Sequence, residues 1–191
     1  MNVTEKSKPT GGIKFLRAML AALCVALLSI QALAEEPNNY ADRQAHVINN
    51  SPLVELSGFK FSNEYRERAF RLVTDLSWKN VGEVPITAFE VVVAYFDPFN
   101  RPISSGGGRW LVPGNNSGNW SPLEPGQSNA DGLIGRRAQD AFTGFVYVRA
   151  VRLQDGTVWM FDENEIRAAI KEKLPEVRSF ENVSPPLESE E

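Results

Sequence analysis

The sequence predicts an all-β domain, an antiparallel β-sandwich of about seven short strands followed by one helix. Apolar and polar residues alternate from Phe70 to Trp78 and again from Phe145 to Leu153, which is typical of strands with one buried face. Asp155-Gly156 separates two apolar runs and predicts a hairpin turn. Only the stretch after Asp162 has the spacing of an amphipathic helix.

The first residues have the parts of a secretory signal peptide. Lys14 and Arg17 precede an apolar run that ends in Ala32-Leu33-Ala34, with small residues at the two positions that specify cleavage. The run is shorter than the roughly 20 apolar residues that span a bilayer, although an uncleaved anchor is the alternative. We expect residues 1–34 to be removed after Ala34, which predicts a periplasmic or secreted protein with no stable membrane span.

Cys24 is the only cysteine and lies inside this leader. Leu23, which precedes it, is not the small residue that a lipoprotein signal requires, so lipidation is disfavoured. Cleavage leaves a chain without cysteine, and therefore without a disulfide or a cysteine-based zinc site. We expect no metal and no cofactor, and a fold that is stabilised by its core.

The charge balance excludes some classes of partner. Loss of Lys6, Lys8, Lys14, Arg17 and Glu5 with the leader lowers the 20 basic and 24 acidic residues to 16 and 23, a formal net charge of −7. Nucleic acid is bound largely through neutralisation of phosphates by Lys and Arg, so we expect no nucleic-acid partner. The same balance argues against docking on an anionic membrane surface.

The domain is expected to span residues 53–174. Residues 35–52 are polar and without periodicity, which predicts a linker. Residues 53–61 supply a first strand, and residues 70–78 a second with one polar face. Residues 86–96 are apolar on both faces except for Glu90, which predicts a central strand covered by the core on one side and by loops on the other.

The second half of the domain is richer in turns. After a turn at residues 97–100, short strands are expected at 101–104 and 110–112, within or beside a Gly-rich loop over residues 105–121. Residues 127–138 are a weaker strand candidate, and residues 145–153 and 157–161 form the predicted hairpin.

The predicted helix begins after Asp162, which can cap it, with Glu165 three residues on in the position of a capping box. Ile166, Ala169, Ile170 and Leu174 form an apolar stripe. We expect this helix to pack over one open end or edge of the sandwich. Residues 175–191 contain three prolines and end in acidic residues, which predicts a disordered tail.

Three segments carry a resemblance to a known family: 76–82 (LSWKNVG), 123–126 (LEPG) and 151–159 (VRLQDGTVW). In this order they resemble the small immunoglobulin-like β-sandwich domains of unknown function found in bacterial extracytoplasmic proteins. The resemblance covers roughly residues 53–161 and implies a fold and a compartment. It implies no activity, because these domains share no catalytic residues that could be carried over.

No group of residues predicts catalysis. His46 is the only histidine and lies in the predicted linker, where a solvated side chain is expected rather than a general base. The stretch Ser104–Gly108 lacks the Gly-Lys-Ser/Thr of a phosphate loop. Asp97 and Asp155 fall in turns, and Asp162 and Glu165 have a capping role. We therefore predict that the protein is not an enzyme.

The loop over residues 105–121 is the predicted contact surface. Its candidate binding residues are Arg109, Trp110, Asn116, Asn119 and Trp120. Exposed tryptophans beside amides suit a peptide segment or the face of a sugar, although at least one of the two rings is expected to fold back onto the sandwich.

The remaining tryptophans, Trp78 and Trp159, lie on predicted strands and are expected in the core, whereas Arg149 and Arg152 are expected on solvated strand faces. We expect a non-enzymatic interaction or accessory module of the bacterial envelope, which binds another envelope or extracellular protein through sheet edges or the 105–121 loop. A glycan-binding module that uses Trp110 and Trp120 is the alternative.

Overall fold

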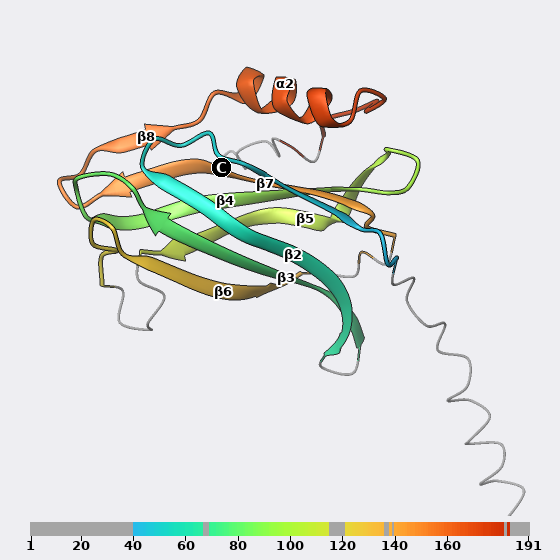
Figure 1. The fold of residues 1–191 in the computed structure, drawn as a ribbon, viewed down its shortest axis with the longest axis horizontal. Helices are drawn as coiled ribbons and strands as arrows, with labels where there is room; N and C mark the ends of the chain where they lie inside the picture. Colours follow the sequence, from blue (N-terminus) through green and yellow to red (C-terminus); the bar gives the residue numbers. More distant parts are fainter. Residues whose placement is uncertain are drawn as a thin grey trace, which may run out of the picture. The chain divides into compact units, whose positions relative to one another are not determined.

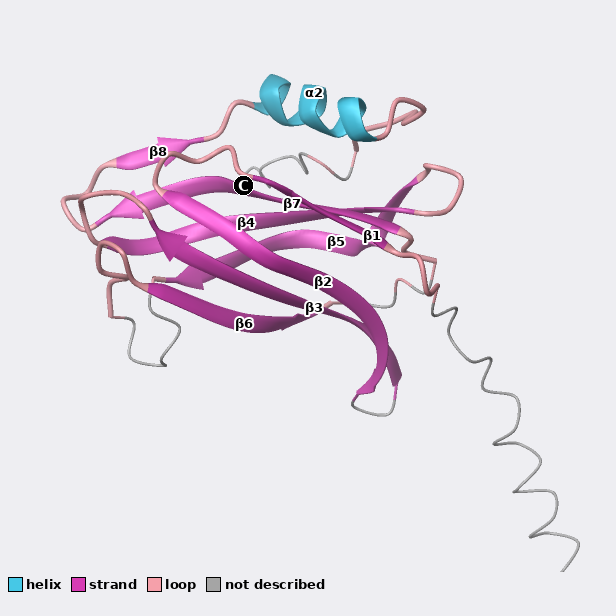
Figure 2. Cartoon of the chain, viewed as in Figure 1, coloured by secondary structure: helices cyan, strands magenta, loops and turns pink. Residues whose placement is uncertain are grey.

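The computed structural model describes residues 40–66, 69–114, 121–135, 138, 140–181 and 183. The chain divides into two compact units, residues 1–36 and 37–191, and every described residue belongs to the second. The predicted signal peptide, residues 1–34, lies outside the described residues. The described part contains two β-sheets and one helix (Figures 1 and 2), which confirms the predicted all-β class with a late helix.

The described part forms eight strands and one helix. They are β1 (Gln44–Ile48), β2 (Val54–Arg66), β3 (Ala69–Asn80), β4 (Ile86–Phe96), β5 (Pro102–Pro113), β6 (Ser128–Ile134), β7 (Thr143–Leu153), β8 (Val158–Met160) and α2 (Glu163–Lys173). The first sheet, sheet A, has the order β1-β7-β4-β5, with β8 pairing with the other half of β7. The second, sheet B, has the order β2-β3-β6. All pairs are antiparallel except β1 and β7, which are parallel and so depart from the prediction.

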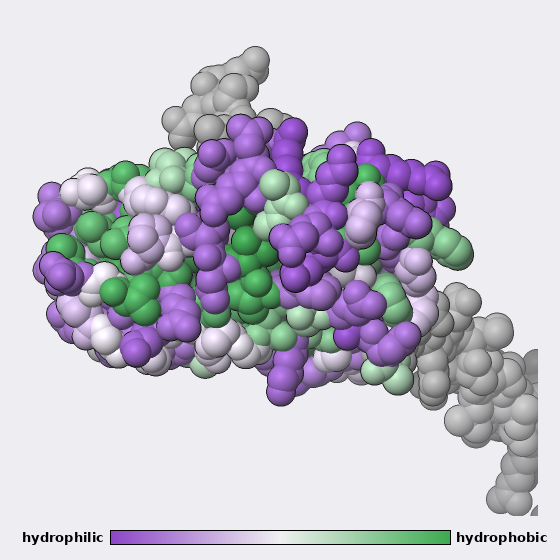
Figure 3. Space-filling view, turned by 45° about the horizontal axis from the view of Figure 1, so that its top comes forward, coloured by the Kyte–Doolittle hydropathy of each residue, from purple (hydrophilic) through white to green (hydrophobic). Residues whose placement is uncertain are grey.

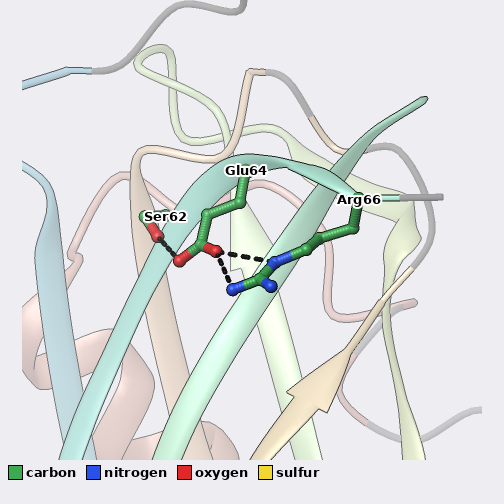
Figure 4. A network of polar contacts seen from close by, with 3 residues as sticks. All are labelled: Ser62, Glu64 and Arg66. Carbon is green, nitrogen blue, oxygen red and sulfur yellow. Dashed lines mark hydrogen bonds and ion pairs between the residues drawn. The ribbon is translucent and has the colours of Figure 1, made fainter. Parts of the chain in front are cut away.

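Sheet B has one apolar and one polar face, as the alternation of residues 70–78 predicts. Leu72, Leu76 and Trp78 are almost fully buried against sheet A, whereas the other face of the sheet meets solvent. On that polar face, Ser62 and Arg66 both donate hydrogen bonds to the carboxylate of Glu64 (Figure 4). Exposed ion pairs of this kind contribute roughly 0–1 kcal/mol, so this face is a solvated surface rather than a second core.

Part of sheet A is buried on both faces, because α2 covers part of the face opposite sheet B (Figure 1). Side chains at alternate positions of β4 enter different cores: Val91 and Val93 face sheet B, whereas Val92 packs beneath α2 with Ile166 and Ile170. The prediction that loops cover the second face of residues 86–96 is therefore wrong. The prediction that this helix packs over an end or edge of the sandwich is also wrong. The sequence shows that one side of the helix is apolar, but it does not show which surface that side packs against.

The main core lies between the two sheets and contains one buried polar pair. The hydroxyls of Thr74, in sheet B, and Tyr95, in sheet A, form a hydrogen bond of 2.5 Å. Both residues are at most 1% exposed, and burial raises the pKa of Tyr95 well above its usual value. A neutral phenol paired with a hydroxyl satisfies both polar groups inside an otherwise apolar interior.

The segment predicted as a linker, residues 35–52, contains strand β1 and two asparagines that connect the sheets; residues 35–39 lie outside the described part. The side-chain amide of Asn49 donates to the carbonyl of Leu56 in β2 and accepts from its N–H, at 3.2 and 2.8 Å. Asn50 does the same with Val148 in β7, at 2.9 and 3.2 Å. Two adjacent side-chain amides therefore form hydrogen bonds with backbone groups of both sheets, on one side of the sandwich.

His46 is also placed differently from the prediction of a solvated side chain. It lies in β1, is half-buried, and stacks on Phe145 with ring centroids 5.0 Å apart. Burial and, secondly, the charge of Lys173 lower its pKa. The sequence around it gave no sign of this contact, because β1 has no alternating apolar pattern.

The predicted tail also begins with ordered contacts. Val177 and Phe180 pack against the cluster beneath α2, Val183 is fully buried there, and the hydroxyl of Tyr147 donates to the carbonyl of Val183. The prediction of disorder is therefore wrong for this part, because these apolar residues complete the cover of sheet A. Residues 182 and 184–191 lie outside the described residues.

Candidate interaction surface

The described residues form no group of three or more His, Cys, Asp and Glu side chains that could hold a metal ion. One hollow of about 200 Å³ lies beside Asp97, Arg101 and Asp140. Asp97 accepts hydrogen bonds from the backbone N–H groups of Phe99 and Arg101 and pairs with the Arg101 guanidinium, at 2.6–2.9 Å. These bonds stabilise a turn, so Asp97 has a structural role there.

The predicted contact loop is mostly a strand. Residues 105–113 belong to β5, the last strand of sheet A, which has no further strand beyond it in the described part of the chain. The pairing shifts between Val93 and Tyr95 of β4, since Gly108 faces the first and Ile103 the second. Residues 104–107 thus form a bulge, an arrangement that limits pairing along an edge, and leave 108–113 as the regular part.

Alternation along β5 sends its predicted binding residues to opposite faces of sheet A. Trp110 is half-buried and packs against the core between the sheets, whereas Arg109 and Leu111 lie on the face that α2 partly covers. Asn116, Asn119 and Trp120 lie outside the described residues. Of the five predicted residues, only Arg109 is therefore placed at an exposed position of the surface described next.

The helix covers only part of the outer face of sheet A. The register aligns Leu111, Glu90, Ala150 and Met160 in one row across four strands. A parallel row contains Pro113, Ala88, Arg152 and Val158. We call these two rows the open face.

Three apolar side chains of the open face are exposed. Leu111 is 65% exposed, Met160 54% and Val158 49%. In the space-filling view, apolar side chains reach the surface on the left, where β8 lies, between hydrophilic ones (Figure 3). Val158 and Met160 are neighbours on β8, and Leu111 lies at the other end of the row of Met160, on β5. Single exposed apolar residues are common, whereas apolar side chains grouped on one face are typical of interaction sites.

A charged cluster lies at the border between the open face and the residues that α2 covers, and Glu90 belongs to both the cluster and the open face. Arg149 donates from Nη1 to Oε1 of Glu90 at 3.1 Å, and Nε of Arg109 lies 3.8 Å from the same oxygen. The guanidinium of Arg149 also lies 5.9 Å from the ring centre of Phe161. Two arginines thus share one carboxylate.

Arg149 is buried, which corrects the prediction that it is solvated. Only 8% of its side chain is exposed, and its Nε has no hydrogen-bond partner among the described residues. The pairing of β7 with β4 shifts at this point, because Val148 faces Val91 while Ala150 faces Glu90, and Arg149 is the extra residue of the bulge. Bulges re-aim a side chain in this way.

Sequence reasoning missed Glu90, Leu111, Arg149 and Met160 as members of one site. Glu90 did interrupt a strand that is otherwise apolar on both faces, and a carboxylate at such a position requires a cation nearby. That signal indicates a cationic side chain on a neighbouring strand. Which residue supplies the cation depends on the register of the strands, which the sequence does not specify.

No family model and no curated protein matches the sequence. Among solved structures, the fold is similar to a hypothetical protein from Peptoclostridium difficile 630, with a TM-score of 0.46 and 10% identity, over 63% of this chain and 92% of that one. A second similarity is to the Northeast Structural Genomics Consortium target SoR45, with a TM-score of 0.34 and 10% identity, over 57% and 80%. Neither likeness supports an inference about function.

Among the described residues, no helix is both long enough and apolar enough to cross a bilayer.

Proposed function

We propose that this chain is an exported, non-enzymatic interaction module with an immunoglobulin-like sandwich, and that it binds another protein through the open face and the adjoining edge of β5. The observation that carries the proposal is the half-covered outer face of sheet A. Its remaining part exposes Leu111, Val158 and Met160 beside two arginines that share one carboxylate. Exposed apolar residues within a polar setting are the usual core of a protein interface.

The order of the strands supports the immunoglobulin-like part of the proposal. An immunoglobulin sandwich places strands A, B and E in one sheet and C, F and G in the other. Strands β2, β3 and β6 correspond to A, B and E, and β4, β7 and β8 to C, F and G, with β5 next to C. Strand β1, parallel to β7, is an addition at the other half of the same edge.

Two of the segments that carry the family resemblance, 76–82 and 123–126, meet at one end of the sandwich, which supports the same proposal. The amide of Asn80 donates to the carbonyls of Val84 and Leu123 and accepts from the N–H of Gly82. The N–H of Gly126 in turn donates to the backbone carbonyl of Asn80. These bonds fix a corner between strands, which gives Asn80, Gly82 and Gly126 a structural role.

Export is supported by the leader, residues 1–34, and by a domain that needs no cysteine. N-terminal sequencing of the protein recovered from outside the cytoplasm should begin at Glu35. A product that retains residues 1–34 in the membrane fraction would favour the anchored alternative.

Site-specific photo-crosslinking in the producing cells tests the surface. A photoreactive amino acid at Leu111 or Met160 should capture one and the same protein, and Leu111→Glu should abolish capture from position 160. Lys79, on the polar face of sheet B, is the matched control position and should capture nothing in common with the other two. Equal capture from all three positions would contradict the proposal.

The glycan-binding alternative now depends on Trp120 alone, because Trp110 packs against the core. Loss of binding to a peptidoglycan or glycan array on Trp120→Ala, with Leu111→Glu without effect, would select it.

A further inference from the structure

We propose that the partner presents an extended acidic segment, whose carboxylate is bound by Arg109 while an adjacent apolar side chain contacts Leu111. This inference rests on the proposed function and specifies the chemistry of its partner. It follows from the net charge of the open face and its border, which is positive, whereas the net charge of the whole chain is negative.

The charge of this face is the first step. Arg109, Arg149 and Arg152 lie on or beside the open face, and Glu90 is the one acidic side chain in its two rows. The chain as a whole is acidic, with a formal net charge of −4. A positive surface on an acidic protein favours the approach of a segment with the opposite charge.

The bonding of the arginines is the second step. Each guanidinium carries five N–H donors in a planar fork that matches a carboxylate. Arg149 and Arg109 share the single oxygen Oε1 of Glu90, and the distance from Arg109 is 3.8 Å, which is an ion pair but too long for a hydrogen bond. One third of the Arg109 side chain is exposed, so this guanidinium can turn toward an incoming carboxylate.

The position of the apolar residues is the third step. Leu111 lies two residues from Arg109 on the same face of β5, and Met160 lies in the same cross-strand row as Leu111. Residues at i and i+2 of a strand are about 7 Å apart, as are alternate side chains of an extended peptide. An extended segment can therefore place a carboxylate at Arg109 and an apolar side chain at Leu111.

Peptide selection tests this chemistry. A random decapeptide library displayed on phage is selected against the full chain, and the enriched peptides are measured by fluorescence anisotropy at two salt concentrations. The enriched peptides should contain Asp or Glu two residues from an apolar residue. Raising salt from 0.1 to 0.5 M should weaken their binding, because screening shortens the range of charge interactions.

Arg109→Gln should weaken binding of these peptides by about tenfold or more, since a hydrogen bond to a charged group is lost, and Arg109→Lys should retain part of it. Lys79→Gln removes a cation from the outer face of sheet B and should change nothing. Thermal unfolding of each variant establishes that it is folded.

The outcomes separate this inference from the proposed function. Peptides that depend on Leu111 but not on Arg109 or on salt would overturn the acidic partner and leave the surface standing. Peptide binding that depends on neither Leu111 nor Arg109 would overturn both the acidic partner and the proposed surface. If changing Glu188, Glu190 and Glu191 to Gln in the full chain raised peptide affinity, the chain's own C-terminal segment would be the occupant, and the assignment to a separate partner would be wrong.

Discussion

The two asparagines that join the sheets give the sharpest test of the fold. Asn50→Ala removes two hydrogen bonds, to the carbonyl and the N–H of Val148, whose side chain and backbone are 1% exposed. Each bond contributes about 0.5–1.5 kcal/mol net, and solvent reaches this site poorly, so we expect a loss of about 2–3 kcal/mol in the free energy of unfolding. Asn49→Ala removes the matching pair of bonds to Leu56, which is 2% exposed. It should therefore cost a similar amount, about 2–3 kcal/mol.

Urea unfolding followed by tryptophan fluorescence measures both values. Asn164→Ala is the matched control, because Asn164 is exposed on α2 and its change should stay within about 0.5 kcal/mol. The double variant at positions 49 and 50 shows whether the two amides act together. If Asn50→Ala were as mild as Asn164→Ala, the amides would not stabilise the junction of the sheets, and this account of Asn49 and Asn50 would be wrong.

Three further predictions concern the two cores and the single histidine. Trp78→Ala should lower the free energy of unfolding by about 3–5 kcal/mol, and Trp159→Ala by clearly less, because the first ring is 1% exposed whereas the second is only half-buried; equal losses in urea unfolding would contradict this. Ile170→Ala should cost about 2–5 kcal/mol if α2 is part of the cooperative fold, and a variant that loses only its helical circular dichroism signal, with unchanged sheet stability, would show that it is not. Stability should fall as the pH drops below about 6.5, because the pKa of His46 is lowered in the folded state by burial and by Lys173, so the unfolded chain binds the proton more readily. His46→Phe keeps the ring beside Phe145 and should flatten the stability profile between pH 7 and pH 5; an unchanged slope would assign it to other groups.

The strands with strong alternation were predictable, because side chains of opposite faces meet such different surroundings. Residues 86–96 were predicted as a strand that coincides with β4, and the cap of α2 at Asp162 is present, since its carboxylate accepts from the N–H of Asn164. Such features depend on residues that are close in sequence. Trp78 is buried as predicted for the same reason.

Features that depend on distant residues were not predictable. Strand β1 has no apolar alternation and is held by its parallel partner β7, almost 100 residues away. The two asparagines that follow it resemble those of any loop until their partners, Leu56 and Val148, are known. The sequence also does not show which residues of the predicted contact loop share a face, because a one-residue change of register would exchange the faces of Arg109 and Trp110. Only a three-dimensional structure brings Glu90, Arg109 and Arg149 together.

The covering of sheet A by the last described residues has a consequence for the order of biosynthesis. Val92 and Phe145 belong to strands made well before residues 161–183, which bury them. Until that late segment leaves the ribosome or a translocation pore, the outer side of the sheet remains an apolar surface that can associate with other chains. The sheet therefore cannot complete the burial of this side until the C-terminal segment is available, and this interval is the one in which a chaperone that holds apolar segments would act.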